Sequence, residues 1–309
     1  MAKAIRSASL SLALNRSFAY NFKPSIYFEL FAPLVSVEWL ATALQDQNLV
    51  VLDASWHMPG SARDAGQEWL AQRIPGARFF DFDNRICDRD SSLPHMMPDA
   101  ELFTTELRRL GVNSDSTVIV YDSVGIFSSP RAWWMLQAMG LRRSAVLDGG
   151  LPAWRQAGLP LHDSDPEPTG PSGNFTASYR PTLISDWREV LLATSSNDVS
   201  ILDARSADRF YARAPEPRPD LRGGHMPGSR NLPFDQLINS GRMRPVRELQ
   251  QALSARAPTS DRIIASCGSG VTSCVIALAA HLAGYQDIAV YDGSWAEWGA
   301  DATLPVVTG

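Results

Sequence analysis

The sequence predicts an α/β protein made of two tandem domains, each built around a central, mostly parallel sheet flanked by helices. Three observations lead to this fold class. The chain has 309 residues, which is longer than one ordinary domain. Short apolar runs alternate with amphipathic segments, as they do in βα units. Motifs of the first half also return in the same order in the second half.

The repeat begins with a buried strand and a turn. In the first half the strand is 49–54, and Ile-Pro-Gly-Ala-Arg follows at 74–78. In the second half the strand is 199–204, and His-Met-Pro-Gly-Ser-Arg follows at 225–230. Short apolar runs of this kind, bounded by turn residues, are typical of strands covered on both faces.

Two further pairs of segments complete each copy. Apolar strands are predicted at 118–121 and 263–266, and each is followed by a helix-like apolar stretch. The last pair is Val-Leu-Asp-Gly-Gly at 146–150 and Val-Tyr-Asp-Gly-Ser at 290–294. The shared order and spacing predict that the same sheet is built twice.

These segments divide the chain into four parts. An N-terminal extension spans 1–32, the first domain 33–162, a linker 163–178 and the second domain 179–305. The linker is rich in Pro, Gly, Ser and Asp and is expected to be exposed. Residues 1–28 contain basic but no acidic residues, which suits a transit peptide or a disordered extension. We expect a cytoplasmic protein, or a mitochondrial one if this extension is a transit peptide.

The composition excludes several classes of protein. A net charge of −5 and a pI near 5.6 argue against a nucleic-acid binder, and no apolar run is long enough to span a membrane. Lys3 and Lys23 are the only lysines, so the folded body cannot use Schiff-base chemistry or a Walker-type loop. Cys87, Cys267 and Cys274 suit a reducing compartment and form no Cys/His cluster. We therefore predict neither a metal nor a cofactor.

One cysteine lies where a strand meets a helix. Cys267 follows a predicted strand directly and precedes the apolar stretch 275–280. Backbone N–H groups and the helix dipole stabilise an anion there, and they can lower a cysteine pKa from about 8.5 to roughly 3.5–7.5. Gly268 and Gly270 let the backbone curl around that anion. The first copy has Asp122 at this position, which predicts that the first domain is the inactive copy.

Three alternatives to a nucleophilic Cys267 remain to be compared. A buried structural cysteine is common, but packing does not explain a Gly-Ser-Gly turn at a strand-to-helix junction. A cysteine phosphatase needs an arginine six positions after the cysteine, where this chain has Ser273. A dinucleotide-binding turn needs a third glycine at the same position. The loop therefore favours a nucleophilic thiolate.

The loop Cys-Gly-Ser-Gly-Val-Thr at 267–272 resembles the rhodanese superfamily, and within it the branch of 3-mercaptopyruvate sulfurtransferases. The resemblance extends over about residues 33 to 300. Thiosulfate-using rhodaneses carry basic residues just after the cysteine, whereas this chain has Gly268 and Ser269. The resemblance implies two rhodanese-like domains with the active site between them. The loop residues that it implies around a persulfide are Gly268, Ser269, Gly270, Val271 and Thr272.

The resemblance also implies roles for residues outside the loop. Arg209 and Arg218 match the family's substrate-binding pair, and a planar guanidinium can pair bidentately with a carboxylate. The family's serine, histidine and aspartate match Ser269, His95 and Asp83. His95 and Asp83 come from the first domain, so both domains are expected to contribute to catalysis, the first with acid–base groups.

Phe127 and Cys274 each lead to a prediction of their own. Phe127 stands where the family often has a tyrosine, so a hydroxyl is missing there. Cys274 is seven positions after Cys267, about two helical turns on. We predict that Cys274 is a core residue rather than a resolving thiol.

The reaction that the resemblance implies is a double displacement. Cys267 takes the sulfur of 3-mercaptopyruvate, pyruvate leaves, and the sulfur passes to thioredoxin, a small dithiol or cyanide. Two alternatives stay open: a thiosulfate:cyanide sulfurtransferase, and a non-catalytic sulfur carrier or interaction module. No nucleic acid and no membrane is expected among the partners.

Overall fold

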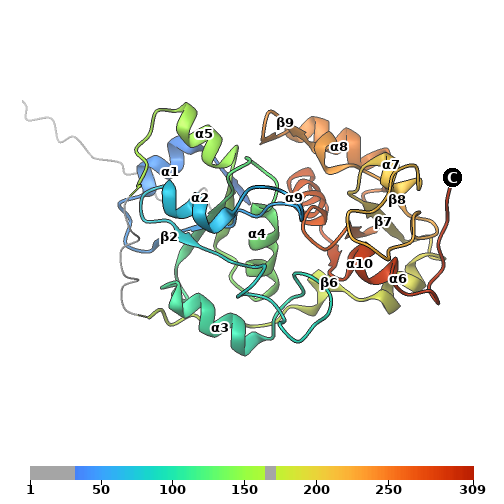
Figure 1. Ribbon diagram of the computed structural model, residues 1–309. Helices are drawn as coiled ribbons and strands as arrows, with labels where there is room; N and C mark the ends of the chain where they lie inside the picture. Colours follow the sequence, from blue (N-terminus) through green and yellow to red (C-terminus); the bar gives the residue numbers. More distant parts are fainter. Residues whose placement is uncertain (1–31, 164–171) are drawn as a thin grey trace, which may run out of the picture.

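The computed structural model describes residues 32–163 and 172–309, which form two α/β domains (Figure 1). Nearly all of the predicted N-terminal extension, and part of the predicted linker, lie outside the described residues. In the described part of the chain, no helix is long and apolar enough to cross a membrane.

The first domain contains a five-stranded sheet in which every strand pair is parallel. The strand order is β1-β5-β4-β2-β3, with the longest strands in the middle. The strands are β1 (Leu34–Val35), β2 (Leu49–Asp53), β3 (Arg78–Phe79), β4 (Thr117–Tyr121) and β5 (Ser144–Leu147).

Helices cover both faces of this sheet, because alternate residues of each strand face opposite sides. Val118 and Val120 of β4 face one apolar cluster, whereas Ile119 faces the other. The first cluster includes residues of α3 and α4, and the second includes residues of α1 and α5. The helices are α1 (Val37–Ala43), α2 (Ala65–Ala71), α3 (Ala100–Arg109), α4 (Ser129–Ala138) and α5 (Gly150–Gln156).

The second domain repeats this sheet with the same topology, as the repeat in the sequence predicts. Its strand order is β6-β12-β11-β7-β8, again with parallel pairs throughout. An antiparallel hairpin, β9–β10, has no counterpart in the first sheet. The strands are β6 (Ile184–Ser185), β7 (Val199–Asp203), β8 (Arg230–Asn231), β9 (Ile238–Asn239), β10 (Arg242–Met243), β11 (Arg262–Ser266) and β12 (Ile288–Tyr291).

The helices of the second domain also lie on both faces of its sheet. Residues of α8 and α9 belong to one apolar cluster, and residues of α6 and α10 to another. The α-helices are α6 (Trp187–Ala193), α7 (Ala207–Phe210), α8 (Val246–Ser254), α9 (Ser273–Ala283) and α10 (Ser294–Trp298). Two 3₁₀ turns are η1 (Pro181–Leu183) and η2 (Phe234–Leu237).

Polar side chains and one glycine fix several helix ends. Ser36, Asp99 and Asp186 each accept a backbone N–H of the first turn of the helix that follows. The last turn of α9 is closed by Gly284 at a φ of +97°, a left-handed conformation that favours glycine. Local sequence thus sets where these helices begin and end.

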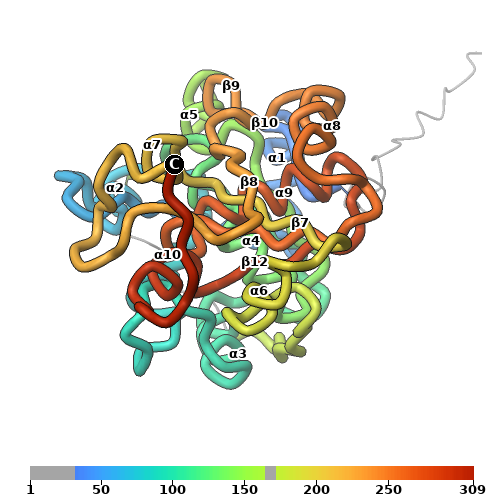
Figure 2. Tube along the Cα trace, turned by 90° about the vertical axis from the view of Figure 1, so that its right-hand side faces the viewer, coloured from blue at the N-terminus to red at the C-terminus, as the bar shows by residue number. Residues whose placement is uncertain are grey.

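The two domains share one apolar core. Helix α4 of the first domain packs against α9 of the second, and the two lie side by side at the centre of the molecule (Figures 1 and 2). One continuous cluster of buried residues includes Trp133 of α4 and Val275 of α9. The interface is therefore made of packed side chains, and it includes α9, the helix that follows Cys267.

The described end of the predicted linker lies against the first domain. Phe175 is only 4% exposed, and its backbone N–H donates to the carbonyl oxygen of Val112. The N–H groups of Ser178 and Arg180 donate to Met139 and Ala138 in the same way. One buried phenylalanine and backbone hydrogen bonds thus bind residues 172–180 to the first domain, while Ser172, Asn174, Thr176 and Ser178 are exposed.

Candidate active site

The cysteine loop joins β11 to α9. Cys267 follows β11 directly, and α9 begins at Ser273. Gly270 has a φ of +76°, and a Cβ there would lie 2.7 Å from the carbonyl oxygen of Asp292, so the turn requires glycine. The Ser294 hydroxyl accepts the N–H groups of Cys267 at 3.1 Å and Gly270 at 3.2 Å. This hydroxyl therefore holds two points of the curl together.

The Cys267 thiol is buried among hydrogen-bond donors. The residue is 2% exposed, and its Sγ lies 3.5 Å from the Ser273 Oγ. Burial raises the pKa of this thiol, but hydrogen bonds from the hydroxyls of Ser273 and Thr272 and from the N–H groups of Ser273 and Ser269 lower it further than burial raises it. The thiolate is the nucleophilic form, so the loop favours a reactive Cys267.

Two guanidinium groups of the second domain lie beside the cysteine loop. Arg209 is so close to Gly268 that a Cβ at this glycine would be 2.9 Å from the Arg209 Nη2. Burial lowers the pKa of Arg218, while the nearby Cys267 thiolate acts in the opposite direction. Two cations beside a nucleophile suit a substrate that carries negative charge.

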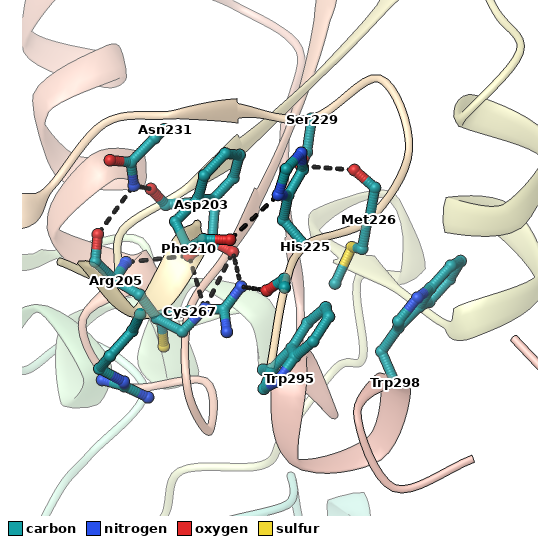
Figure 3. Close-up of polar contacts among 12 residues, drawn as sticks. Asp203, Arg205, Phe210, His225, Met226, Ser229, Asn231, Cys267, Trp295 and Trp298 are labelled. Carbon is teal, nitrogen blue, oxygen red and sulfur yellow. Dashed lines mark hydrogen bonds and ion pairs between the residues drawn. The ribbon is translucent and has the colours of Figure 1, made fainter. Parts of the chain in front are cut away.

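A chain of buried ion pairs holds Arg209 in place. Figure 3 shows the first of these pairs, between Asp203 and Arg205. Arg205 donates to Asp203 at 2.7 Å and to Glu216 at 2.8 Å. The other carboxylate oxygen of Glu216 accepts from the Arg209 Nη2 at 2.5 Å. Arg205 also lies 4.1 Å from the ring centre of Trp295. Because the charges alternate, each is compensated, and the orientation of the Arg209 guanidinium is fixed.

The first domain contributes a histidine and an aspartate. His95 Nδ1 lies 2.6 Å from Asp83 Oδ1, and His95 Nε2 lies 3.4 Å from Arg218 Nη2. His95 is 4% exposed, and its ring meets the rings of Trp56 and Phe82 edge-on. Burial lowers the pKa of His95 despite the opposing effect of Asp83. The neutral imidazole therefore prevails at pH 7 and can accept a proton.

The structure brings most of the predicted site residues together. Those that surround the thiol or one another are Cys267, Gly268, Gly270, Thr272, Arg209, Arg218, His95 and Asp83. Ser269 points its backbone N–H to the sulfur, but between described residues its hydroxyl has no hydrogen bond to His95 or Asp83. The hydroxyls beside the sulfur belong to Ser273 and Thr272, and Val271 is part of the apolar core.

Several residues of the site were not predicted. Ser294 lies in the second Asp-Gly repeat motif, and Glu216 comes two positions before Arg218, so both had a signal close by in the sequence. Asp292 belongs to the same motif, but no sequence signal pairs it with Arg131, because the two residues meet across the domain interface. Only the folded chain shows that these two belong to the site.

Phe127 and Cys274 lie where apolar residues are expected. The Phe127 ring stacks on Trp56, with ring centres 6.0 Å apart, and also packs on Phe234 of the second domain. Cys274 is fully buried in α9, and burial raises the pKa of its thiol far above the ordinary value. Cys274 is therefore a protonated core residue, as predicted.

Asp122 occupies the position in the first domain that Cys267 has in the second. It follows β4 and is fully buried. One carboxylate oxygen accepts the N–H groups of Val124 and Gly125, each at 2.9 Å. The other accepts the N–H groups of Phe127, Ser128 and Ser129 at 2.9–3.0 Å, and the Ser129 hydroxyl at 2.7 Å. The same type of loop thus surrounds a fixed carboxylate instead of a thiolate.

The arrangement around Cys267 is suited to nucleophilic chemistry. It combines a cysteine with a lowered pKa at a helix start, two arginines for an anion, and a neutral histidine. Within the residues that the structure describes, no group of three or more His, Cys, Asp or Glu side chains could hold a metal ion.

Comparison with known proteins gives the same family throughout. The rhodanese-like domain model matches residues 36–157 and 186–301. The chain is 43% identical over 274 residues to 3-mercaptopyruvate sulfurtransferase of Escherichia coli K12, covering 88% of this chain and 96% of that protein. It is 41% identical over 276 residues to thiosulfate sulfurtransferase of Gallus gallus, covering 86% of this chain and 92% of that protein.

A solved structure agrees with both the fold and the family. The crystal structure of SseA from Escherichia coli, described with the 3-mercaptopyruvate sulfotransferases, superposes with a TM-score of 0.78 at 39% identity. The match covers 85% of this chain and 99% of that one. The chain therefore belongs to the rhodanese family, as a two-domain enzyme of its 3-mercaptopyruvate sulfurtransferase branch.

Proposed function

We propose that this enzyme transfers sulfur from 3-mercaptopyruvate through a persulfide on Cys267 to a thiol acceptor. The observation that carries the proposal is a thiolate with a lowered pKa next to the fixed guanidinium of Arg209. The thiolate supplies the nucleophile, and the guanidinium supplies the partner for a carboxylate.

The first half-reaction moves one sulfur atom onto the enzyme. The Cys267 thiolate attacks the sulfur of the substrate, a new S–S bond forms, and the C–S bond of the substrate breaks. The bonding electrons leave with the carbon as pyruvate enolate, which takes up a proton to give pyruvate. Neutral His95, whose Nδ1 is paired with Asp83, would accept the thiol proton and return it to the enolate.

The surrounding groups have separate roles in this proposal. Arg209 and Arg218 hold the carboxylate and ketone oxygens, so the substrate sulfur faces Cys267. The N–H groups of the loop stabilise the negative charge of the persulfide as they do that of the thiolate. Ser269 contributes its backbone N–H.

The second half-reaction restores the thiolate. A second thiolate attacks the outer sulfur of the persulfide, the S–S bond breaks, and Cys267 leaves as the thiolate. A thioredoxin dithiol or a small dithiol would then release sulfide as it closes to a disulfide, whereas cyanide would leave as thiocyanate. All these acceptors use the same Cys267 persulfide.

Mass spectrometry tests the intermediate directly. Reduced protein mixed with 3-mercaptopyruvate should gain the mass of one sulfur atom, and peptide mapping should place it on Cys267. Subsequent addition of a dithiol should remove it. A sulfur adduct on another cysteine, or none during turnover, would contradict the proposed mechanism.

Donor selectivity gives the first prediction. Arg209→Ala and Arg218→Ala should each raise KM for 3-mercaptopyruvate at least about tenfold, the cost of losing a charge-assisted hydrogen bond to the carboxylate. KM for thiosulfate, which has no carboxylate, should change less. Steady-state kinetics with both donors measures the difference. Arg213→Ala, at an exposed arginine of the same segment, is the matched control. Equal effects on both donors would count against carboxylate binding.

The second prediction concerns the residue that orients Arg209. Glu216→Gln keeps the shape of the side chain but removes the charge that binds both Arg205 and Arg209. KM for 3-mercaptopyruvate should rise about tenfold while kcat changes much less, because the loop around Cys267 is untouched. Glu248→Gln, which also removes a carboxylate from an arginine pair, is the control. An unchanged KM in a folded Glu216→Gln protein would refute this role.

Thiosulfate:cyanide sulfur transfer is the second candidate, because the chain is also 41% identical to a thiosulfate sulfurtransferase. Uncharged Gly268 and Ser269 after the cysteine favour 3-mercaptopyruvate, since a sulfonate-like donor is best bound by basic residues there. The ratio of kcat/KM on the two donors decides between them. A folded, reduced protein without turnover on either donor would instead indicate a non-catalytic sulfur carrier or interaction module.

A further inference from the structure

Arg131 is a charged residue of the first domain that lies inside the domain interface. It belongs to α4, the helix that packs against α9 at the centre of the molecule (Figures 1 and 2). Its side chain is 0% exposed. Burying a guanidinium away from water costs free energy unless hydrogen-bond acceptors compensate its charge, so the contacts of Arg131 require an explanation.

Three parts of the active site meet on this one guanidinium. Nη1 donates to the carbonyl oxygen of Gly270 at 3.1 Å and to Asp292 Oδ1 at 2.5 Å. Nη2 donates to the backbone carbonyl oxygen of His95. The Cζ atom of Arg131 also lies 4.8 Å from the ring centre of Trp134. Arg131 thus binds the cysteine loop and the segment that carries the histidine at the same time.

The residues bound by Arg131 are themselves in demanding conformations. Gly270 has a φ of +76°, and His95 has a φ of +62°, where a side chain is rarely found. Asp292 reinforces the contact, because its Oδ2 accepts the N–H of Met97 at 2.7 Å. The guanidinium therefore binds the carbonyl oxygens of two residues whose backbone is in the left-handed region.

A related contact on the other side of the interface shows what is special about Arg131. Asp148, the counterpart of Asp292 in the repeat, accepts the N–H of Met243 at 3.0 Å and lies 3.4 Å from Arg242. The Arg242 side chain is 42% exposed, whereas that of Arg131 is fully buried. Both contacts join the domains, but only Arg131 reaches the cysteine loop.

The charge of Arg131 also lies in the field of the thiolate. Burial lowers the pKa of Arg131, but the Asp292 carboxylate and the Cys267 thiolate help to hold it above the ordinary value. Cys274 remains protonated because burial raises the pKa of its thiol. The charged groups near the Cys267 loop are therefore Arg131 with its partner Asp292 from the interface, and Arg209 and Arg218 beside the loop.

We propose that Arg131 is a positioning residue, through which the domain without the cysteine holds the Cys267 loop and His95 in their reacting geometry. A lysine could supply the charge, but it lacks the planar fork that reaches Gly270, Asp292 and the His95 carbonyl together. The effect on turnover rests on the proposed function. The effect on thiol reactivity does not.

The test compares Arg131→Lys and Arg131→Met with the same two substitutions at Arg242. Arg131→Lys should lower kcat about tenfold or more, with KM for 3-mercaptopyruvate changed less than about threefold, because Arg209 and Arg218 are untouched. Alkylation of Cys267 by iodoacetamide should keep its pH midpoint in Arg131→Lys. The midpoint should move about one unit higher in Arg131→Met, because that variant loses the charge. The Arg242 variants should behave as the parent protein does.

Several outcomes would overturn the inference. They are a parental kcat in Arg131→Lys, an unchanged alkylation midpoint in a folded Arg131→Met, or equal losses in the Arg242 variants. If Arg131→Met does not fold, Arg131→Lys decides alone. If neither folds, Arg131 serves the fold rather than the site, and the inference fails. Absence of sulfur transfer in the parent protein, with the alkylation shift as expected, would refute the proposed function and leave the role of Arg131 intact.

Discussion

Cys267→Ser is expected to abolish sulfur transfer, lowering kcat by roughly 10⁴-fold or more, the scale seen when an enzyme loses its nucleophile. A serine hydroxyl fits the loop, but it does not ionise near neutral pH and forms no persulfide. Pyruvate release from 3-mercaptopyruvate in the presence of a dithiol measures the loss.

The control for this prediction is Cys87→Ala, which removes another buried thiol. Burial raises the pKa of Cys87, so it is a poor nucleophile, and its removal should change kcat less than about threefold. The prediction fails if Cys267→Ser keeps measurable turnover, or if Cys87→Ala loses as much as Cys267→Ser.

The second large effect concerns stability. Asp122→Ala should lower the free energy of unfolding by at least about 3 kcal/mol, because five backbone N–H groups and the Ser129 hydroxyl lose their acceptor in a buried site. Urea denaturation followed by tryptophan fluorescence measures the change. Asp122→Asn, which keeps one acceptor oxygen, should lie between Asp122→Ala and the parent protein.

Asp115→Ala is the control for stability, because Asp115 is exposed in the same domain. It should stay within about 0.5 kcal/mol of the parent protein. A similar small change in Asp122→Ala would show that the loop can satisfy its N–H groups without the carboxylate.

The fold could be predicted because short segments of the sequence determine its strands and helices. Strand β4 is an apolar run between turn residues, and its five residues are all buried in the sheet. The repeat then predicted the second sheet from the first, and the two strand orders are the same. The hairpin β9–β10 was missed, because two-residue strands have too few residues to show alternation.

The candidate site could be predicted in part. Cys267 was found because a strand, a glycine turn and a helix are adjacent in the sequence, and its pKa is lowered as that pattern indicates. The meeting of Arg131 with Asp292 could not be predicted, because it depends on how two separately predicted domains pack. The catalytic roles of Ser269, His95 and Asp83 stay predictions, of which the structure shows the His95–Asp83 contact.

The carboxylate in the first domain also affects how the protein responds to oxidation. A thiolate can be oxidised stepwise to sulfinic and sulfonic acids, but a carboxylate cannot. Asp122 therefore makes its loop chemically inert, while Cys267 in the related loop remains exposed to that damage. Peroxide should therefore abolish activity by oxidising Cys267 while the first domain stays folded. Activity and melting temperature, both measured during peroxide treatment, should decline separately.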